Sequence, residues 1–324
     1  MTKKQVEDDD ELLNDIKTMN IKTFISKAGI FSLLLLAFNN TEVKAQLHPL
    51  GAMYFQNQYL SNPAMAGLEE GLRADLAYRK QWSSIPGAPE TQSLTADYGS
   101  AKKSGVGVSI YNDEAGLQKK TRVMGSYAYH LPLNSNGSKL SFGVSLGFMD
   151  ERLMNEKMNT VNRDYDAAVA KFSDRETYVD GDFGFALSTN KLNIQGALPN
   201  LKSFFGSDQQ EGNLVDQARY FAAVSYKFYL ANTLDGLGVE PKVVYRDIKG
   251  YKSIADIGTN LTLANNQVNV MGMYHTNQSA TLGMGVKYKS LMQIAGMYTS
   301  GTSALRGYTN GNFELNLRVN ISKL

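Results

Sequence analysis

Cysteine is absent from the 324 residues, which excludes disulfide bonds, thiolate chemistry, cysteine-ligated zinc and a lipid anchor on an N-terminal cysteine. Histidine is rare: His48, His130 and His275 are the three, and no pair has the spacing of metal ligands on a helix. The charge is nearly balanced, with 33 basic and 31 acidic residues, whereas nucleic-acid-binding domains usually carry a clustered basic excess. We therefore expect no metal, no cofactor and no nucleic acid among the ligands.

A helix-length apolar run is also missing. The apolar stretch at residues 28–38 is shorter than the roughly 20 residues with which a helix spans a bilayer. Two lysines precede it, and the slim side chains of Val43 and Ala45 follow it, which is the layout of a secretory signal. We interpret residues 1–45 as an N-terminal extension and cleavable signal peptide, with either Met19 as the true start or an unusually long leader. A buried helix of a soluble protein is the alternative.

Apolar residues instead alternate with polar or small residues. In residues 312–321 one face carries Phe313, Leu315, Leu317, Val319 and Ile321, and the other carries Asn312, Glu314, Asn316, Arg318 and Asn320. Residues 140–148 and 281–288 repeat the pattern. A period of two puts successive side chains on opposite faces of a β-strand. A soluble β-sandwich alternates as well, so one such strand does not distinguish a sandwich from a barrel.

The number and spacing of the strands favour a barrel. We predict about fourteen, each close to the ten residues that cross a membrane at a tilt. They cover residues 72–82, 91–99, 104–111, 120–131, 138–149, 177–188, 190–197, 217–229, 237–246, 254–263, 267–275, 280–289, 291–299 and 310–321. Connections after even-numbered strands are mostly short, and the two longest, near 150–176 and 198–216, follow odd-numbered ones. The prediction is all-β: a transmembrane antiparallel up-and-down β-barrel of the bacterial outer membrane, with twelve or sixteen strands as alternatives.

Closure has a physical reason, since the hydrocarbon core offers no water and only a sheet without edges pairs all its backbone groups. We assign residues 72–324 to the barrel and residues 46–71 to a periplasmic N-terminal segment. In the first strand Arg73, Asp75, Arg79 and Gln81 share the face that is expected to point into the lumen, opposite an apolar face.

No residue set predicts catalysis, and we expect that the protein is not an enzyme. A serine nucleophile beside His130 or His275 is the alternative, and it requires the two groups within hydrogen-bond reach. Residues 105–108 resemble the start of a phosphate loop, but no helix pattern follows. The acidic residues Asp164, Asp166, Asp174, Glu176, Asp180 and Asp182 suit a solvated outer loop better than calcium, since their spacing matches no EF-hand.

Three short motifs follow the leader. The first, N-P-A-M-A-G, contains Asn62, Pro63, Ala64 and Gly67. The second, Y-R-K-Q-W, contains Tyr78, Arg79, Gln81 and Trp82, and the third, G-A-P-E-T, contains Gly87, Pro89 and Thr91. Together they resemble the PorP/SprF family of type IX secretion system membrane proteins of Bacteroidetes, whose members carry N-P-A-x-x-G, Y-R-x-Q-W and G-x-P-x-T in this order. Beyond these motifs the resemblance is in length and strand pattern alone.

The resemblance implies an outer-membrane component of the type IX secretion system that assists secretion or surface anchoring of exported proteins, such as the adhesins of gliding bacteria. It also implies partners: other secretion components at the periplasmic face and a secreted adhesin or cargo protein, in addition to outer-membrane lipid. We expect the long connections at 150–176 and 198–216 to make the contacts at the outer surface.

The motif residues themselves read as structural. Pro63 and Gly67 suit a turn before the first strand, and Trp82 suits the membrane face at that strand's outer end. A passive porin or solute channel is the alternative function. A channel predicts a water-filled interior, whereas a secretion partner predicts a filled lumen.

Overall fold

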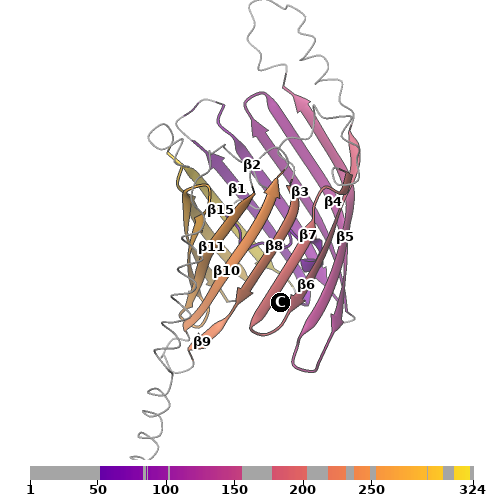
Figure 1. Cartoon of the computed structure of the whole chain (residues 1–324), viewed down its shortest axis with the longest axis vertical. Coiled ribbons are helices and arrows are strands. Elements are labelled where there is room, and N and C mark those ends of the chain that lie inside the picture. Colours follow the sequence, from indigo (N-terminus) through magenta and orange to yellow (C-terminus); the bar gives the residue numbers. More distant parts are fainter. Residues whose placement is uncertain are drawn as a thin grey trace, which may run out of the picture. The chain divides into compact units, whose positions relative to one another are not determined.

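The computed structural model describes residues 52–82, 85, 87–100, 103–154, 177–202, 218–230, 237–248, 253–289, 291–301 and 310–321 (Figure 1). All of them belong to one compact unit, residues 43–324. Among the described residues, no helix is long and apolar enough to cross a membrane.

The described chain is almost entirely β-strand, as the alternation predicts. A short 3-10 helix, η1 (Pro63–Met65), comes first. The strands are β1 (Gly71–Gln81), β2 (Glu90–Gly99), β3 (Ser104–Ala115), β4 (Gln118–Pro132), β5 (Lys139–Leu153), β6 (Tyr178–Ser188), β7 (Leu192–Leu198), β8 (Ala218–Tyr226), β9 (Phe228–Leu230), β10 (Leu237–Ile248), β11 (Ile254–Leu263), β12 (Val268–His275), β13 (Ser279–Tyr288), β14 (Met292–Thr299) and β15 (Asn312–Asn320).

The strands form one closed antiparallel ring. Each pairs with the next along the chain, except that β8 pairs with β10 and not with β9, and β15 returns to pair with β1, from Asn320 opposite Arg73 to Asn312 opposite Gln81. β8 and β9 lie end to end along the same side of β10, so they count as one stave. The described strands therefore make a barrel of fourteen staves, and the prediction of an up-and-down barrel is confirmed.

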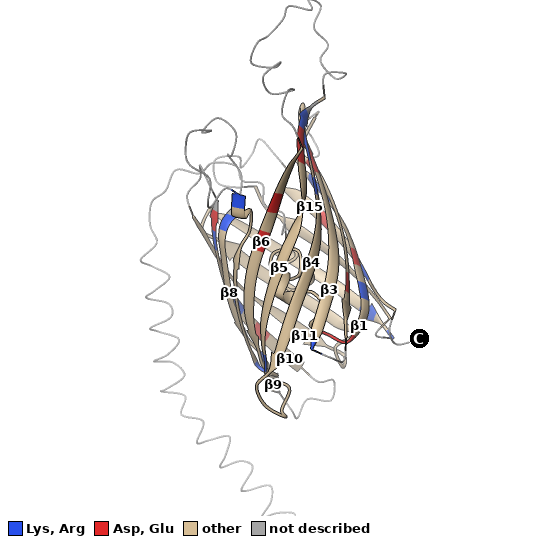
Figure 2. Ribbon diagram, turned by 90° about the vertical axis from the view of Figure 1, so that its right-hand side faces the viewer, with Lys and Arg blue, Asp and Glu red and all other residues tan. Residues whose placement is uncertain are grey.

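The two faces of the ring differ in chemistry. Large apolar side chains point outward and stay exposed, as with Leu146 (67%), Leu282 (66%) and Leu315 (61%). The inward face carries buried polar and charged residues, among them Asp75 and Arg79, as predicted. The outer wall in Figure 2 is free of charge over most of its height, with charged residues concentrated toward its ends. An apolar outer face on a closed ring suits a hydrocarbon solvent.

The two ends of the barrel also differ. One end, called here the short-turn end, holds the brief connections such as Ala264–Asn266, whose three residues all have positive φ. It also holds the start of β1 and the end of β15. The opposite end, called here the long-connection end, holds the connections at residues 154–177 and 199–217. Because outer-membrane barrels turn briefly on the periplasmic side, we assign the short-turn end to the periplasm.

The outer belt generates a prediction about depth. Leu146 lies midway along β5 and Leu131 lies near the short-turn end of β4, and both point outward. We expect Leu146→Arg to lower the free energy of unfolding in lipid vesicles by about 2–4 kcal/mol, and Leu131→Arg by only about 0–1 kcal/mol, because a charge costs most at the bilayer midplane. Urea titrations of the two variants measure the difference, and equal losses would contradict a membrane-spanning belt.

Candidate functional site inside the barrel

A stretch of chain runs through the interior of the barrel. This lumenal segment, residues 52–70, begins near the long-connection end, where the Ala52 N–H donates to Glu314 Oε2 at 2.7 Å. Midway, Asn57 donates to Thr95 Oγ1 at 2.9 Å on β2. Near the short-turn end, the Gly67 N–H donates to Asp97 Oδ2 at 2.8 Å. The segment therefore descends through the lumen and contacts several walls on the way.

This position differs from the periplasmic segment that we expected over residues 46–71. The described part of that range, residues 52–70, lies within the ring of strands. Its side chains explain why: Gln56, Asn57 and Asn62 are polar yet at most 5% exposed, and a buried polar group needs a hydrogen-bonding partner. The inward faces of the strands supply such partners to Asn57 and Asn62, namely Thr95 and the Phe185 carbonyl.

The N-P-A turn lies deepest in this packing. Asn62 is fully buried; its Oδ1 accepts from the Ala64 N–H at 3.0 Å and its Nδ2 donates to the Phe185 carbonyl at 3.1 Å on β6. Pro63 takes the first turn of η1, where its missing N–H costs nothing. The turn is thus capped by its own asparagine and tied to the wall by the same side chain.

Glycines in the wall make room for the turn. A Cβ on Gly143 of β5 would overlap the Pro63–Ala64 peptide, and a Cβ on Gly184 of β6 would overlap Asn62 Oδ1. On β3, a Cβ on Gly107 would come within 2.7 Å of the Tyr59 ring. These inward positions are glycine because the lumenal segment presses against the backbone there.

Gly67 ends the turn with backbone geometry that only glycine adopts without strain. Its φ is +61°, and a Cβ there would also overlap the Tyr98 carbonyl of β2. Its N–H shares Asp97 with Arg73, whose guanidinium donates to both carboxylate oxygens at 2.9 and 3.1 Å. The predicted turn before β1 is present, and it joins the segment to the wall through a buried ion pair.

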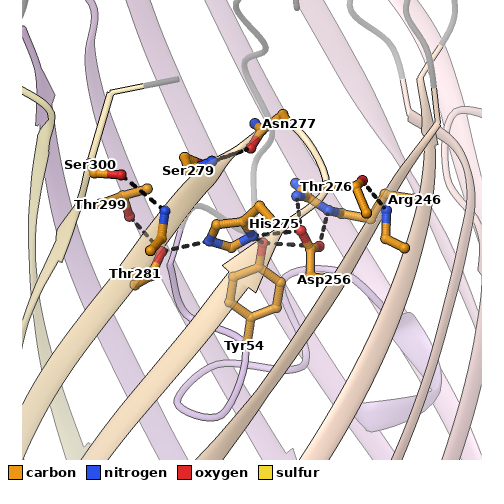
Figure 3. A network of polar contacts seen from close by, with 12 residues as sticks. Tyr54, Arg246, Asp256, His275, Thr276, Asn277, Ser279, Thr281, Thr299 and Ser300 are labelled. Carbon is orange, nitrogen blue, oxygen red and sulfur yellow. Dashed lines mark hydrogen bonds and ion pairs between the residues drawn. The ribbon is translucent and has the colours of Figure 1, made fainter. Parts of the chain in front are cut away.

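Near the long-connection end a charged network holds Tyr54 (Figure 3). Arg246 of β10 donates two hydrogen bonds to Asp256 of β11, at 2.7 and 2.9 Å. The Tyr54 hydroxyl donates to Asp256 at 3.1 Å, and His275 Nδ1 lies 2.6 Å from the same carboxylate. From the other side, Lys242 Nζ donates to the Tyr54 carbonyl at 2.7 Å. A bidentate arginine–carboxylate pair is a rigid anchor for the phenol.

The same network contains a carboxylate, a histidine and a hydroxyl in line. His275 Nε2 lies 2.7 Å from Thr281 Oγ1, which also lies 2.7 Å from Thr299 Oγ1. His130 forms a similar pair with Ser141, 2.8 Å apart. The serine–histidine pair that the sequence left open for a catalytic site is therefore present at His130, whereas the hydroxyl beside His275 belongs to Thr281 and not to a serine. Thr281 and Ser141 are 1% and 0% exposed, however, so these hydroxyls tie neighbouring strands together. No group of three His, Cys, Asp or Glu residues in the described chain could hold a metal ion.

Comparison with known proteins now identifies the family. Residues 43–319 match the sequence model of the family described as type IX secretion system membrane protein PorP/SprF. The chain belongs to this family. The resemblance drawn from the three motifs is confirmed, and so is the outer-membrane location. The match is to a family of membrane proteins and not to an enzyme family. No curated protein matches the chain.

The chain is also similar to several solved structures. Omp33 of Acinetobacter baumannii is 9% identical, with 79% of this chain and 100% of that chain covered and a TM-score of 0.43. The toluene transporter TbuX of Ralstonia pickettii is 11% identical, with coverages of 87% and 96% and a TM-score of 0.46. The KdgM porin is 10% identical, with coverages of 77% and 99% and a TM-score of 0.37. The barrel itself is established by its own strand pairing.

The PorP/SprF motifs divide between the two ends of β1. Asn62, Pro63, Ala64 and Gly67 lie in the lumen beside the short-turn end. The other two motifs, Tyr78 to Trp82 and Gly87 to Thr91, lie at the opposite end of the barrel. The structure therefore does not gather the motif residues into one site.

At the long-connection end, Arg79 and Gln81 are buried and inward-facing as predicted, and Arg79 donates to Thr91 Oγ1 at 2.9 Å. Thr91 in turn donates to Asp113 at 2.5 Å. Tyr78 points outward and is 38% exposed.

The connection after β1 is held by its backbone. The Gln81 N–H donates to the Pro89 carbonyl at 2.9 Å, and the Gly87 carbonyl accepts from Gly116 at 3.0 Å. Trp82, half-buried with a φ of +46°, donates its N–H to Gly311 at 2.8 Å. The motifs at this end shape the rim of the barrel.

Two predictions fall mainly outside the described residues. Of the acidic residues considered for calcium, Asp180 and Asp182 are described, and Asp182 pairs with Arg122 at 2.5 Å. Asp164, Asp166, Asp174 and Glu176 lie outside, as do most of the connections at 150–176 and 198–216.

The close packing of the N-P-A turn generates a prediction. We expect Gly143→Ala to lower the free energy of unfolding by about 1–3 kcal/mol, because the added methyl group overlaps the Pro63–Ala64 peptide. Gly125→Ala in β4 is the matched control, since its Cβ would meet the nearest atom at 3.8 Å. Denaturant titration compares the two, and a neutral Gly143→Ala would show that the turn is not pressed against β5.

Proposed function

We propose that this PorP/SprF protein assists the secretion or surface anchoring of exported proteins, adhesins of gliding bacteria among them, and that its barrel does not serve as a solute channel. The observation that supports this proposal is the lumenal segment. It is hydrogen-bonded to β15 and β11 near one end and to β2 and β6 near the other. A barrel whose own chain runs through its lumen suits a scaffold better than a conduit.

The porin alternative requires a water-filled path. Along the lumenal segment, Tyr54, Tyr59 and Met65 are at most 6% exposed, and each lies against the wall or against its neighbours. Several of its anchors are hydrogen bonds to buried charged groups of the wall, such as Glu314, Asp256 and Asp97, and such bonds are stronger than those between neutral groups. This arrangement favours a persistent filling of the lumen.

The proposed partners are other type IX secretion components on the periplasmic side and a secreted adhesin or cargo protein. Family membership supports an association with the secretion system. The short-turn end is the face that a periplasmic component would meet, and the long-connection end faces the cell surface, where exported proteins are retained.

Deletion of the gene tests the function. We expect fewer proteins, or different ones, in the culture medium and on the cell surface, measured by quantitative mass spectrometry, with recovery when the native gene is restored. The Gly125→Ala variant, which we expect to fold normally, should restore secretion equally well. An unchanged secreted and surface-attached proteome would contradict the proposal.

Conductance in planar bilayers tests the porin alternative. We expect the native protein to conduct at least tenfold less than a variant in which residues 52–67 are replaced by a glycine-serine chain of equal length, because that chain keeps none of the lumenal contacts. Sedimentation and circular dichroism check that the ring remains folded. Equal, porin-like conductance of both proteins would favour the channel.

A further inference from the structure

A cavity of about 380 Å³ lies under the lumenal segment at the short-turn end. We call it the vestibule. Gln56 and Met65 of the segment form its inner surface, and residues near the short-turn ends of β7 to β15 form its wall, among them Tyr229, Asn260 and Gln293. A binding pocket for a small ligand usually has at least 300 Å³, so the vestibule admits a short piece of a partner but no folded domain.

Two buried side chains at the vestibule have an oxygen without a partner. Gln56 Oε1 and Asn260 Oδ1 make no hydrogen bond within the described chain, although the residues are only 5% and 7% exposed. Leaving a buried acceptor unpaired destabilises a protein, because the oxygen has lost water and gained no partner. Both residues line the vestibule, so a donor that enters it and reaches these oxygens would supply the missing hydrogen bonds.

The rim of the vestibule exposes an unpaired strand edge. β9 pairs with β10 alone among the described strands, because β7 starts at Leu192, opposite Tyr226. On that side the last backbone bond is from the Lys227 N–H to the Lys191 carbonyl, at 2.7 Å. β9 lies at the lower end of the barrel in Figure 1. In so short a strand this edge presents the backbone N–H and C=O of Tyr229, because those of Phe228 and Leu230 point toward β10.

The break between β8 and β9 has a local cause. The register is the same on both sides, with Ser225 opposite Lys242 and Phe228 opposite Val239. Pro241 lies between these two β10 positions, and its missing N–H interrupts the ladder. The interrupted ladder leaves β9 as a short separate strand whose Phe228 and Tyr229 line the vestibule.

We propose that the vestibule binds an extended polypeptide segment of a periplasmic partner, which adds to the free edge of β9 and donates hydrogen bonds to Gln56 and Asn260. An open backbone edge is complementary to another backbone, and strand addition is a common mode of peptide recognition. The lining amides can both donate to and accept from peptide groups, and Lys287 and Glu69 offer both signs of charge. This inference rests on the proposed function, in that it assumes a periplasmic partner.

Gln56 belongs to the lumenal segment and to the vestibule at once. Its backbone carbonyl accepts from Arg318, which also holds Asp75 on β1 at 3.0 Å. A peptide that bonds to the Gln56 side chain therefore touches the filling of the lumen directly, and occupancy of the vestibule stabilises the segment in place.

Site-specific photocrosslinking in living cells tests the proposal. The probes are Tyr229→p-benzoylphenylalanine on β9 and Gln293→p-benzoylphenylalanine on the wall of β14, each in the complete protein. Tyr288→p-benzoylphenylalanine is the matched control, since Tyr288 lies at the short-turn end of β13 but points outward, with 60% exposure. We expect the first two positions to give adducts that map within one contiguous stretch of one protein, and the control to give at least tenfold less of it.

Asn260→Leu adds a second readout. We expect it to reduce the adduct from position 229 at least tenfold while leaving the unfolding midpoint unchanged or raised, because it removes an unpaired buried acceptor. Any one of four results would overturn the proposal. They are the absence of a protein adduct at position 229, equal adducts at position 288, adducts scattered over a folded surface, and an adduct to lipid or sugar. If the deletion strain has a changed secretome but no adduct forms, the proposed function stands and the vestibule proposal fails. If an adduct forms but the deletion strain has no secretion defect, the vestibule proposal stands and the proposed function fails.

Discussion

In the hydrocarbon core of a bilayer a backbone N–H or C=O without a partner costs several kcal/mol, and the pairing of β15 with β1 is what removes the last two edges of this sheet. Closure then determines the side chains. Residues that point outward meet lipid and are apolar, whereas residues that point inward share an enclosed space with one another. Charged groups in that space are paired, as Asp75 is with Arg318 and Arg122 with Asp182, or hydrogen-bonded to backbone, as Lys242 is to the Tyr54 carbonyl.

The lumenal segment is the counterpart of this enclosed polar wall. Its amide and hydroxyl groups form hydrogen bonds with inward-facing groups of the strands. The Tyr59 hydroxyl, for example, donates to Ser126 Oγ at 2.8 Å. Where the segment lies directly against the backbone of a strand, the inward-facing residue of that strand is glycine. Ring and filling are therefore one packing unit, and neither has its hydrogen bonds complete without the other.

Much of this architecture could be predicted from the sequence, because strand periodicity is a local property. The pattern at residues 312–321 gave the direction in which each side chain of β15 points, and the spacing of such patterns gave fourteen staves. Asp75, Arg79 and Gln81 face the lumen as the alternation required. The interruption at Pro241 was not predicted, since residues 217–229 look like one strand until their partner is known.

The position of the lumenal segment was beyond the reach of local pattern. Its contacts join residues far apart in the chain, such as Asn62 and Phe185, and no periodicity records them. Two signals were present all the same. Polar residues are dense between Gln56 and Asn62, and glycines recur at inward strand positions such as Gly143 and Gly184. Recurrent inward glycines in a membrane strand indicate that some other backbone lies against the wall.

The hydrogen bond between Ala52 and Glu314 joins residues that are 262 positions apart in the sequence, close to the full span of the described chain. The start of the lumenal segment therefore makes this contact only when β15 is in place. Contacts between residues so far apart in the sequence raise the contact order of the fold, and a high contact order goes with slow folding. A chain in which β15 has not paired with β1 has two open sheet edges, and its lumenal segment lacks the contact between Ala52 and Glu314.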